Sequence, residues 1–276
     1  MNLAGRRVLL TGATGGIGAA MAGELARAGA HLLLSARDAA MLEALAGELT
    51  EKTRAAGRRT AVLTEPGDIT DATARERLAR RARGFEGGID VLINNAGVNA
   101  LSRFDDQSSA DIEALVQINL LAPMLLTRTL LPHLLARPAA RLLNVGSVLG
   151  SIGMAGQAVY STTKFGLHGF TEALRREYAG TALEVLYLAP RATRTAMNGD
   201  AACRMNEELG VAMDPPEQVA RRAMALLAGS RLERFIGWPE RLFVKLNAVA
   251  PRLVDGALGK QRPVVEAYLR PRTSSQ

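Results

Sequence analysis

The segment YSTTK, from Tyr160 to Lys164, places a phenol and an ammonium group four residues apart. On a helix, residues i and i+4 share a face, so both groups would point at the same place. A tyrosine in water has a pKa of about 10, and a nearby positive charge favours phenolate and lowers that pKa. We therefore predict that Lys164 makes Tyr160 a proton donor that works near neutral pH, provided that other residues complete a site.

A glycine-rich segment, TGATGGIG, runs from Thr11 to Gly18, directly after an apolar run and directly before a helix-like one. Glycines let a backbone turn sharply and approach a pyrophosphate closely, and a helix N-terminus adds unpaired N–H groups. The spacing is G-x-x-x-G-x-G, through Gly12, Gly16 and Gly18. Glycine clusters also occur in plain turns, but the position between first strand and first helix favours nucleotide binding.

Short apolar runs alternate with helix-length segments along the chain. The helical segments include Gly16 to Gly29 and Asp38 to about Ala56, and the apolar runs are RRVLLT, HLLLSA, TAVLTE, IDVLINN, ARLLNVGS and LEVLYLA. Strands that alternate with helices form βαβ units with right-handed crossovers. Hydrophobic residues make up 48 % of the chain and aromatic residues only 4 %, which suits parallel strands under Ala-rich helices. We predict an α/β fold with a doubly wound parallel sheet and helices on both faces.

Local signals predict where several helices begin and end. Gly29 is expected to terminate the first helix as a C-terminal glycine. Asp38 and Thr70 are each expected to cap the helix that follows them. Asp214 is expected to cap a helix whose first turn contains prolines, where proline is tolerated.

The charged and metal-binding residue types exclude several functions. The formal net charge is +7, but the arginines are scattered along helix-like stretches, without a dense basic block that contains aromatics, so we expect no nucleic-acid partner. Such a basic surface favours anionic ligands, including phosphorylated cofactors and acidic carrier proteins. The single cysteine, Cys203, cannot form a disulfide within the chain. His31, His133 and His168 have no partner at metal-ligand spacing, so no metal site is expected.

The N-terminal residues predict a cytoplasmic location. MNLAGRRVLL runs directly into an apolar strand, without a recognisable signal peptide ahead of it. No stretch of 18 uncharged apolar residues is present, so we expect no membrane span.

Three motifs in one order resemble the short-chain dehydrogenase/reductase family. They are T-G-x-x-x-G-I-G, then N-N-A-G at Asn94 to Gly97, then Y-x-x-x-K, and the similarity extends from about Gly5 to Phe235. The glycine spacing resembles the single-domain branch of the family. The resemblance implies a Rossmann-type fold, a nicotinamide cofactor, and reduction of a ketone or aldehyde to an alcohol by hydride transfer, or the reverse reaction.

The resemblance also implies the catalytic residues, which are Asn119, Ser147, Tyr160 and Lys164. Tyr160 is expected to donate a proton to the carbonyl oxygen, which Ser147 holds by a hydrogen bond. Lys164 is expected to lower the pKa of Tyr160 and to hold the nicotinamide ribose. Asn119 is expected to position, through its backbone, a water molecule that leads protons to Lys164.

The end of the second strand bears on the choice of cofactor. An acidic residue there would select NAD, but this chain has Ala36 followed by Arg37, and a guanidinium can pair with a 2′-phosphate. We predict NADP(H) rather than NAD(H), with Asp38 interpreted as a helix cap; the alternative is that Arg37 is an exposed loop residue. The expected cofactor-binding residues are Gly12, Thr14, Gly15, Gly16, Ile17, Gly18, Arg37, Asp68, Ile69, Asn95, Ala96, Gly97, Tyr160, Lys164, Pro190, Thr193 and Thr195.

After the sixth strand the chain departs from the family pattern. Pro190 is present, but Arg191 replaces the glycine of the usual Pro-Gly pair, and Thr195 fits the spacing of the family threonine better than Thr193. Arg191 could lie near a cofactor phosphate, at the mouth of the pocket, or in a solvated loop. The methionines between residues 196 and 213 suggest a lipophilic substrate, and core packing explains them equally well.

The tail forms a separate region, with residues 1–237 as the catalytic domain and residues 238–276 as a helical extension. Leu242, Leu246, Val249 and Leu253 fall on one helical stripe. This stripe could contact a second subunit, cover the substrate cleft or lie on a membrane. Pro251 interrupts a long surface helix, which favours the first two. We expect residues 270–276 to be disordered.

The combined prediction is an NADPH-dependent carbonyl reductase that acts on a small-molecule carbonyl or alcohol. The alternatives are a 3-oxoacyl-carrier-protein reductase type of activity and a nonenzymatic NADP(H)-binding sensor. We expect a homodimer or homotetramer built on the helices that carry Asn119 and Tyr160, and no membrane partner.

Overall fold

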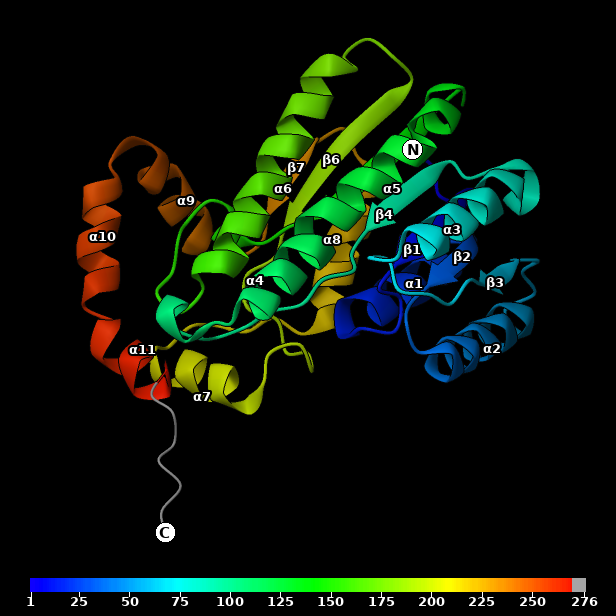
Figure 1. The fold of residues 1–276 in the computed structure, drawn as a ribbon. Coiled ribbons are helices and arrows are strands. Elements are labelled where there is room, and N and C mark those ends of the chain that lie inside the picture. Colours follow the sequence, from blue (N-terminus) through cyan, green and yellow to red (C-terminus); the bar gives the residue numbers. More distant parts are fainter. Residues whose placement is uncertain (270–276) are drawn as a thin grey trace.

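A seven-stranded parallel sheet forms the centre of the computed structural model, which describes residues 1–269 (Figure 1). The strands follow the order β3-β2-β1-β4-β5-β6-β7, with β1 beside both β2 and β4. This order is that of a doubly wound sheet, so the predicted fold class is confirmed. The disorder predicted for residues 270–276 lies outside the described residues. The strands are β1 (Arg7–Thr11), β2 (His31–Ser35), β3 (Val62–Thr64), β4 (Val91–Asn94), β5 (Ala140–Val145), β6 (Leu183–Ala189) and β7 (Glu233–Phe235).

Helices cover both faces of the sheet, and a further group lies at one end (Figure 1). One face packs against α1, α2 and α8, and the other against α3, α5 and α6. The helices are α1 (Gly16–Arg27), α2 (Ala39–Ala55), α3 (Ala72–Gly84), α4 (Ser109–Val116), α5 (Ala122–Leu135), α6 (Ala158–Glu177), α7 (Asp200–Glu208), α8 (Pro216–Ala228), α9 (Glu240–Val249), α10 (Pro251–Gly259) and α11 (Arg262–Leu269).

Strand residues alternate between two apolar cores, because successive side chains of a strand point to opposite faces. In β1, Val8 and Leu10 belong to the core under α1, α2 and α8, whereas Leu9 belongs to the core under α3, α5 and α6. In β6, Leu186 and Leu188 likewise lie opposite Val185. Both faces of the sheet are therefore buried, as the continuous apolar runs of the sequence predict.

Two of the four predictions for helix ends, those for Gly29 and Asp38, are confirmed. Gly29 follows α1 with a φ of 80°, and the Asp38 carboxylate accepts a hydrogen bond from the Met41 amide at 2.9 Å. The prediction for Thr70 is wrong, because Asp71 caps α3 while the Thr70 hydroxyl donates to Asp68. The prediction for Asp214 is also wrong, since Pro215 precedes α8 directly and the carboxylate of Asp214 pairs with an arginine instead.

The longest continuous helix, Ser109–Leu135, contains α4, a π-helical turn at Gln117–Leu121, and α5. Among residues 1–269, it is the one helix whose length and mean hydropathy of 1.5 would allow it to cross a membrane, with 39 % of the relevant window buried. Leu126, Leu130 and Leu134 of this helix pack into the core beneath the sheet. Core helices of α/β domains have the same composition, so this is weak evidence for a span.

The last three described helices form an arm beside the sheet, coloured orange to red in Figure 1. This arm runs from α9 through α10 to α11, which lies next to α7 (Figure 1). Val254 of α10 is buried against Val148 and Ile152, which follow β5. No residue of α9 is fully buried. The extension therefore packs on the C-terminal edge of the sheet through few apolar contacts.

Candidate active site

A cavity of about 800 Å³ opens at the C-terminal edge of the sheet, where ligands bind in open α/β folds. All of the site residues predicted from the sequence line this cavity except Asn119. The predicted residues that line it are Gly12, Thr14, Gly15, Gly16, Ile17, Gly18, Arg37, Asp68, Ile69, Asn95, Ala96, Gly97, Ser147, Tyr160, Lys164, Pro190, Thr193 and Thr195. Residues from seven different segments of the chain are thus brought together, while their individual roles remain predictions.

The glycines of the first turn are required by close backbone contacts. Gly12 has a φ of 65°, and a Cβ atom on it would lie 2.7 Å from the Cα of Ala96. A Cβ on Gly18 would lie 2.1 Å from the carbonyl oxygen of Gly12. The amide nitrogen of the Asn95 side chain donates to the carbonyls of Thr11 and Gly12, both at 3.1 Å. The turn after β1 is therefore fixed against the N-N-A-G segment after β4.

The N-terminus of α1 fits an anionic group such as a pyrophosphate. Gly15 caps this helix without a side-chain hydrogen bond, and the first turn contains no acidic residue. The first amide groups of α1 therefore have no side-chain acceptor, and the helix dipole favours negative charge there. The geometry suits the phosphates of a dinucleotide.

Arg37 and Asp68 lie farther along the cavity, where the resemblance places the adenosine half of a cofactor. Arg37 is exposed and has no hydrogen bond or ion pair with any residue from 1 to 269. Asp68 accepts from the amide and hydroxyl of Thr70 at 2.8 and 2.7 Å. The backbone hydrogen bond from Thr70, with a smaller contribution from Arg37, lowers the pKa of Asp68. An unpaired guanidinium and an ionised carboxylate are therefore available to a ligand.

Ser147 follows β5 in a loop that closes around the side chain of Tyr187. The Tyr187 hydroxyl lies 3.4 Å from both the amide nitrogen and the carbonyl oxygen of Ser147. A Cβ on Gly146 or Gly150 would lie 2.1 or 2.5 Å from that hydroxyl, so neither position can carry a side chain without a shift. The ring of His168 stacks on Tyr187 at 4.3 Å. The backbone of Ser147 is thus supported from within the core.

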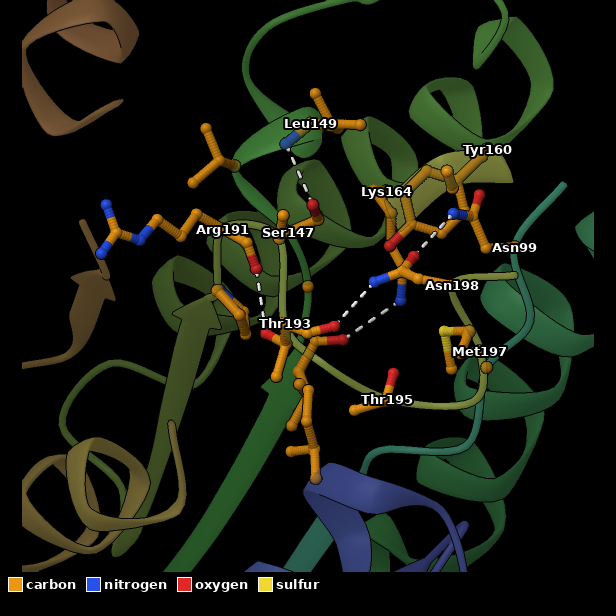
Figure 2. A pocket seen from close by; sticks show the side chains of 18 of the residues that line it. Asn99, Ser147, Leu149, Tyr160, Lys164, Arg191, Thr193, Thr195, Met197 and Asn198 are labelled. Carbon is orange, nitrogen blue, oxygen red and sulfur yellow. Dashed lines mark hydrogen bonds between the residues drawn. The ribbon is translucent and has the colours of Figure 1, made fainter. Parts of the chain in front are cut away.

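Tyr160 and Lys164 face the cavity from α6, as their four-residue spacing predicts (Figure 2). The Lys164 ammonium group lies 5.7 Å from the centre of the Tyr160 ring and donates to the carbonyl of Val145 at 3.2 Å. Burial lowers the pKa of Lys164 to about 8. Burial raises the pKa of Tyr160, and a hydrogen bond with Ser147 opposes this in part.

The predicted lowering of the Tyr160 pKa by Lys164 is therefore not found in this structure. The ammonium group hydrogen-bonds the backbone of β5 rather than the phenol oxygen, and both groups are desolvated. Desolvation disfavours the charged form of each group, so the phenol stays neutral to higher pH than it would in water. A neutral phenol is the form that can donate a proton.

Asn119 lies behind the cavity rather than in its wall. Its side chain is almost fully buried, accepts from the amide of Val98 and donates to the carbonyl of Val98, both at 2.9 Å. It occupies the π-helical turn, and Pro123, four residues on, has no N–H to offer its carbonyl. π-helical turns often mark functional sites. The side chain thus fixes the segment after N-N-A-G, and the carbonyl lacks its usual helical partner.

The segment after β6 ties two parts of the site together (Figure 2). Arg191 forms two hydrogen bonds with the buried carboxylate of Asp214, at 3.0 and 2.7 Å. It also contacts Glu240, at the start of α9, at 3.4 and 3.5 Å. Arg191 lines the cavity and is paired with two carboxylates, so it is not a free, solvated loop residue. The hydroxyl of Thr193 donates to the Arg191 carbonyl at 3.0 Å, and Thr195 faces Gly16.

The remaining wall of the cavity comes from α7 and from the extension α9–α11, which together we call the roof. The roof contributes mostly apolar side chains, namely Ala202, Met205, Leu209, Phe243, Val254, Ala257 and Leu258, with Asn206, Glu240 and Gln261 as polar members. Of the predicted methionines, Met197 and Met205 line the cavity. The hydroxyl of Tyr268 in α11 donates to Glu208 at the end of α7 at 2.9 Å, which joins the two parts of the roof.

Sequence analysis did not identify the polar residues Asn99, Gln157 and Asn198, which also line the cavity. Asn99 lies two residues after the N-N-A-G motif, and Gln157 lies directly before α6, three residues before Tyr160. Proximity to a recognised motif was the signal that could have identified these two. No comparable signal marks Asn198, since its position depends on the loop before α7.

Comparisons with known proteins place this arrangement in a family. A family model described as short chain dehydrogenase matches residues 6–205. Ketoacyl reductase HetN from Nostoc sp. is 31 % identical over 260 residues, which cover 92 % of this chain and 88 % of the relative. Acetoacetyl-CoA reductase from Allochromatium vinosum is 34 % identical over 234 residues, which cover 81 % of this chain and 91 % of the relative.

A solved structure extends the match to the described fold. A short-chain dehydrogenase from Sphingobium yanoikuyae, solved in complex with NADPH, has a TM-score of 0.75 and 26 % sequence identity. The match covers 98 % of this chain and 99 % of that protein, so it includes the helical extension as well as the sheet. The resemblance predicted from the three motifs is confirmed. The chain belongs to the short-chain dehydrogenase family and is an oxidoreductase with a Rossmann-type nucleotide-binding fold.

Proposed function

We propose that the protein reduces a ketone or aldehyde to an alcohol with NADPH, using Tyr160 as the proton donor. The observation that carries the proposal is the convergence of Ser147, Tyr160 and Lys164 on one cavity whose other end is a glycine turn at a helix N-terminus. A bound reduced nicotinamide supplies the hydride for such a reaction. The protein must then bind the carbonyl, deliver a proton and exclude water.

Ser147 and Tyr160 supply the two contacts that a carbonyl oxygen needs. The Ser147 hydroxyl can orient the oxygen, and the neutral phenol of Tyr160 can transfer its proton as negative charge develops there. Burial raises the pKa of Tyr160, so the proton is retained until the substrate oxygen becomes basic. Lys164 lies within the same cavity wall, and its pKa of about 8 allows it to pass on a proton near neutral pH.

Asn119 would complete a proton path to Lys164. Its carbonyl lacks the N–H partner that residue 123 would provide if it were not proline. The proposed water on that carbonyl would lead protons to Lys164, whose ammonium lies near the Asn119 side chain: a Cβ on Gly97 would lie 3.1 Å from Asn119 Oδ1 and 3.6 Å from Lys164 Nζ. We infer that Asn119 acts through its backbone, as the family resemblance implies.

NADP(H) is the proposed cofactor because of Arg37. Its guanidinium has no partner among the described residues, lines the cavity, and follows the end of β2, where the adenosine ribose of a dinucleotide is held in such folds. A 2′-phosphate would give this guanidinium a charge-assisted partner. The NADPH complex of the Sphingobium yanoikuyae relative agrees with this choice.

The apolar side chains of the roof are the reason for proposing a lipophilic substrate. Aliphatic, methionine and phenylalanine side chains of the roof face the catalytic residues across the cavity. Pockets of this kind gain affinity from buried apolar area and specificity from a few polar groups. The names of the relatives favour one substrate class, the 3-oxoacyl thioesters, as a second candidate, since two of them are a ketoacyl reductase and an acetoacetyl-CoA reductase.

A homodimer or homotetramer is the proposed assembly. The long helices α4–α5 and α6 each have one outward side, and Phe165 of α6 is 43 % exposed there. Association through these helices would cover that ring and would support the segments that carry Asn119 and Tyr160. Light scattering of the purified protein at micromolar concentration measures the mass, and a monomer would contradict this assembly.

Replacement of Tyr160 by phenylalanine tests the proposed reaction. Tyr160→Phe keeps the ring and removes the proton, so we expect kcat for NADPH-dependent carbonyl reduction to fall by about 10²- to 10⁴-fold with an unchanged Kd for NADPH. Tyr178→Phe, near the end of the same helix, is the matched control and should retain full activity. Unchanged turnover in Tyr160→Phe would exclude Tyr160 as the donor, and NADPH binding without turnover in the wild type would favour the sensor.

A further inference from the structure

Two side-chain oxygens in the cavity are buried and have no hydrogen-bond partner among the described residues. They are Oδ1 of Asn99 and Oε1 of Gln157. Both residues line the cavity that contains Tyr160. Buried polar atoms are almost always hydrogen-bonded in native proteins, because an unpaired one costs about 1–3 kcal/mol. Two unpaired acceptors in one pocket therefore need an explanation.

The orientation of the Asn99 amide follows from its neighbours. The Asn198 amide nitrogen donates to the carbonyl of Thr193 at 2.7 Å, and a carbonyl can only accept. Asn198 must then present its oxygen to Asn99, whose amide nitrogen donates to it at 3.3 Å (Figure 2). A flipped amide at either position would place two oxygens or two NH₂ groups together. The free atom of Asn99 is therefore its oxygen, an acceptor.

Gln157 provides a second, independent observation. It precedes α6, three residues before Tyr160, and its side chain is 5 % exposed. The side chain makes no hydrogen bond with any residue from 1 to 269, although it is held in the cavity wall. Ser147, Leu149 and Met154, from the loop that precedes α6, line the same cavity. An unsatisfied amide is thus placed one helical turn from the proton donor.

We propose that Asn99 and Gln157 form an acceptor subsite that selects carbonyl substrates carrying a hydrogen-bond donor, either a hydroxyl or an amide N–H, close to the reacting carbonyl. A donor of this kind could give its hydrogen to either oxygen, whereas a plain ketone would leave both oxygens buried and unpaired. Sites that hydrogen-bond a substrate group discriminate strongly against analogues that lack it. The inference rests on the proposed reductase function and specifies the polar part of an otherwise lipophilic substrate.

Two matched substrate pairs test the subsite and separate the two donor types. The hydroxyl pair is α-hydroxyacetophenone and α-methoxyacetophenone, and the amide pair is acetoacetanilide and N-methylacetoacetanilide. Each pair differs by a methyl group that replaces the donor hydrogen. We expect the wild type to prefer the donor-bearing member of one or both pairs by about 5- to 150-fold in kcat/KM, the range that one unsatisfied buried group implies.

Variants assign this preference to the two residues. In Asn99→Leu and Gln157→Leu the preference should fall toward unity, because the acceptor is replaced by an apolar group of similar size. The Kd for NADPH and the unfolding midpoint should stay near the wild-type values. A preference that persists in both variants would overturn the proposal. A weaker Kd for NADPH in Asn99→Leu, with the preference unchanged, would also overturn it, by assigning the oxygen to the cofactor.

A binding measurement keeps the inference testable without turnover. Calorimetry with Tyr160→Phe loaded with NADP⁺ gives the Kd of each ketone directly. A tighter Kd for the donor-bearing member, lost when Asn99→Leu is added, supports the subsite; equal Kd values within both pairs overturn it. If the wild type binds the donor-bearing ketones selectively but never reduces any of them, the proposed reaction fails while the subsite stands.

Discussion

The two sides of the cavity are built in different ways. The side formed by residues 11–18, 35–37, 67–69 and 95–97, which we call the floor, is held at Gly12 and Gly18 by backbone contacts in which an added Cβ would collide at 2.7 and 2.1 Å. The roof, α7 with α9–α11, contains a helix with no buried residue, and its glycines, such as Gly256, have open space around them. The floor therefore tolerates almost no change, whereas the roof tolerates much.

This difference separates the part of the site that suits a dinucleotide from the part that would determine the choice of substrate. A dinucleotide has one shape, so its site can be rigid and specified by glycines, a strand end and a helix N-terminus. The rest of the cavity is lined from loops and from the roof helices, for example by Asn99, Asn198, Met205 and Phe243. Rigid scaffolds with variable loops are a common arrangement in enzymes.

The largest effect is expected from Lys164, a buried amine of α6 that lines the same cavity. Burial lowers its pKa from 10.5 to about 8 in the folded protein. Between about pH 8 and 10 the unfolded chain binds this proton while the folded chain has released it, so stability rises with pH in that window. The gain is about 2–3 kcal/mol by linkage. Urea unfolding of the cofactor-free protein at several pH values measures it.

Lys164→Met is the control for that measurement, because it removes the titrating group and keeps an apolar stem. The difference in unfolding free energy between wild type and Lys164→Met should change by about 2–3 kcal/mol from pH 8 to 10. Subtraction of the two curves cancels the effects of other groups, including Tyr160, whose raised pKa acts in the opposite direction above pH 10. A constant difference would show that Lys164 is not desolvated.

Added methyl groups compare the floor with the roof directly. Gly18→Ala places a Cβ 2.1 Å from the Gly12 carbonyl oxygen, so we expect a loss of about 2 kcal/mol and a weaker Kd for NADPH. Gly23→Ala in the same helix and Gly256→Ala in α10 meet no atom within 4 Å. Both should stabilise the protein by up to about 1 kcal/mol, because alanine favours helix. Thermal and urea unfolding of all three variants gives the comparison, and a neutral Gly18→Ala would remove the claimed rigidity of the floor.

The floor was predictable from the sequence because local patterns determine it. Gly12, Gly16 and Gly18 signal a phosphate turn from their spacing together with their position between the first strand and the first helix, and the apolar runs of the sheet signal buried parallel strands. Tyr160 and Lys164 were placed on one helix face by their spacing. The effect of burial on the Tyr160 pKa was not predictable, because desolvation depends on residues that are distant in sequence.

The roof was not predictable for the same physical reason. The stripe of Leu242, Leu246, Val249 and Leu253 indicated an amphipathic helix but not what it packs against. In the structure Leu246 faces the core beside Val254, while Val249 is 82 % exposed, so the stripe does not act as one face. Pairing of Arg191 with Asp214 and Glu240 joins segments 23 and 49 residues apart. Such contacts follow from topology rather than from local pattern.

The Arg191 network tests how firmly the roof is attached. Arg191→Met leaves the carboxylate of Asp214, which is 3 % exposed, without its cation, so we expect a loss of about 2 kcal/mol in the free energy of unfolding. Glu240→Gln weakens only the longer contact to α9, and should cost less than about 1 kcal/mol. Urea unfolding measures both. If Glu240→Gln costs as much as Arg191→Met, the roof is held as firmly as the floor and the comparison fails.

The last comparison concerns cofactor binding at the exposed end of the floor, where Arg37 faces solvent. Removal of a guanidinium that pairs with a 2′-phosphate should weaken NADPH binding by about tenfold, or about 1.4 kcal/mol, and should leave NADH binding unchanged. Arg59→Ala, at an exposed arginine outside the cavity, corrects for the loss of positive charge. Fluorescence titration of Arg37→Ala and Arg59→Ala with both cofactors separates a specific contact from a general charge effect.

Equal losses of NADPH affinity in the two variants would show that the net charge of the surface, rather than a contact at Arg37, attracts the phosphate. A loss confined to Arg37→Ala would locate cofactor choice on one unpaired side chain of an otherwise rigid floor, because the glycine turn and α1 contact parts that both cofactors share.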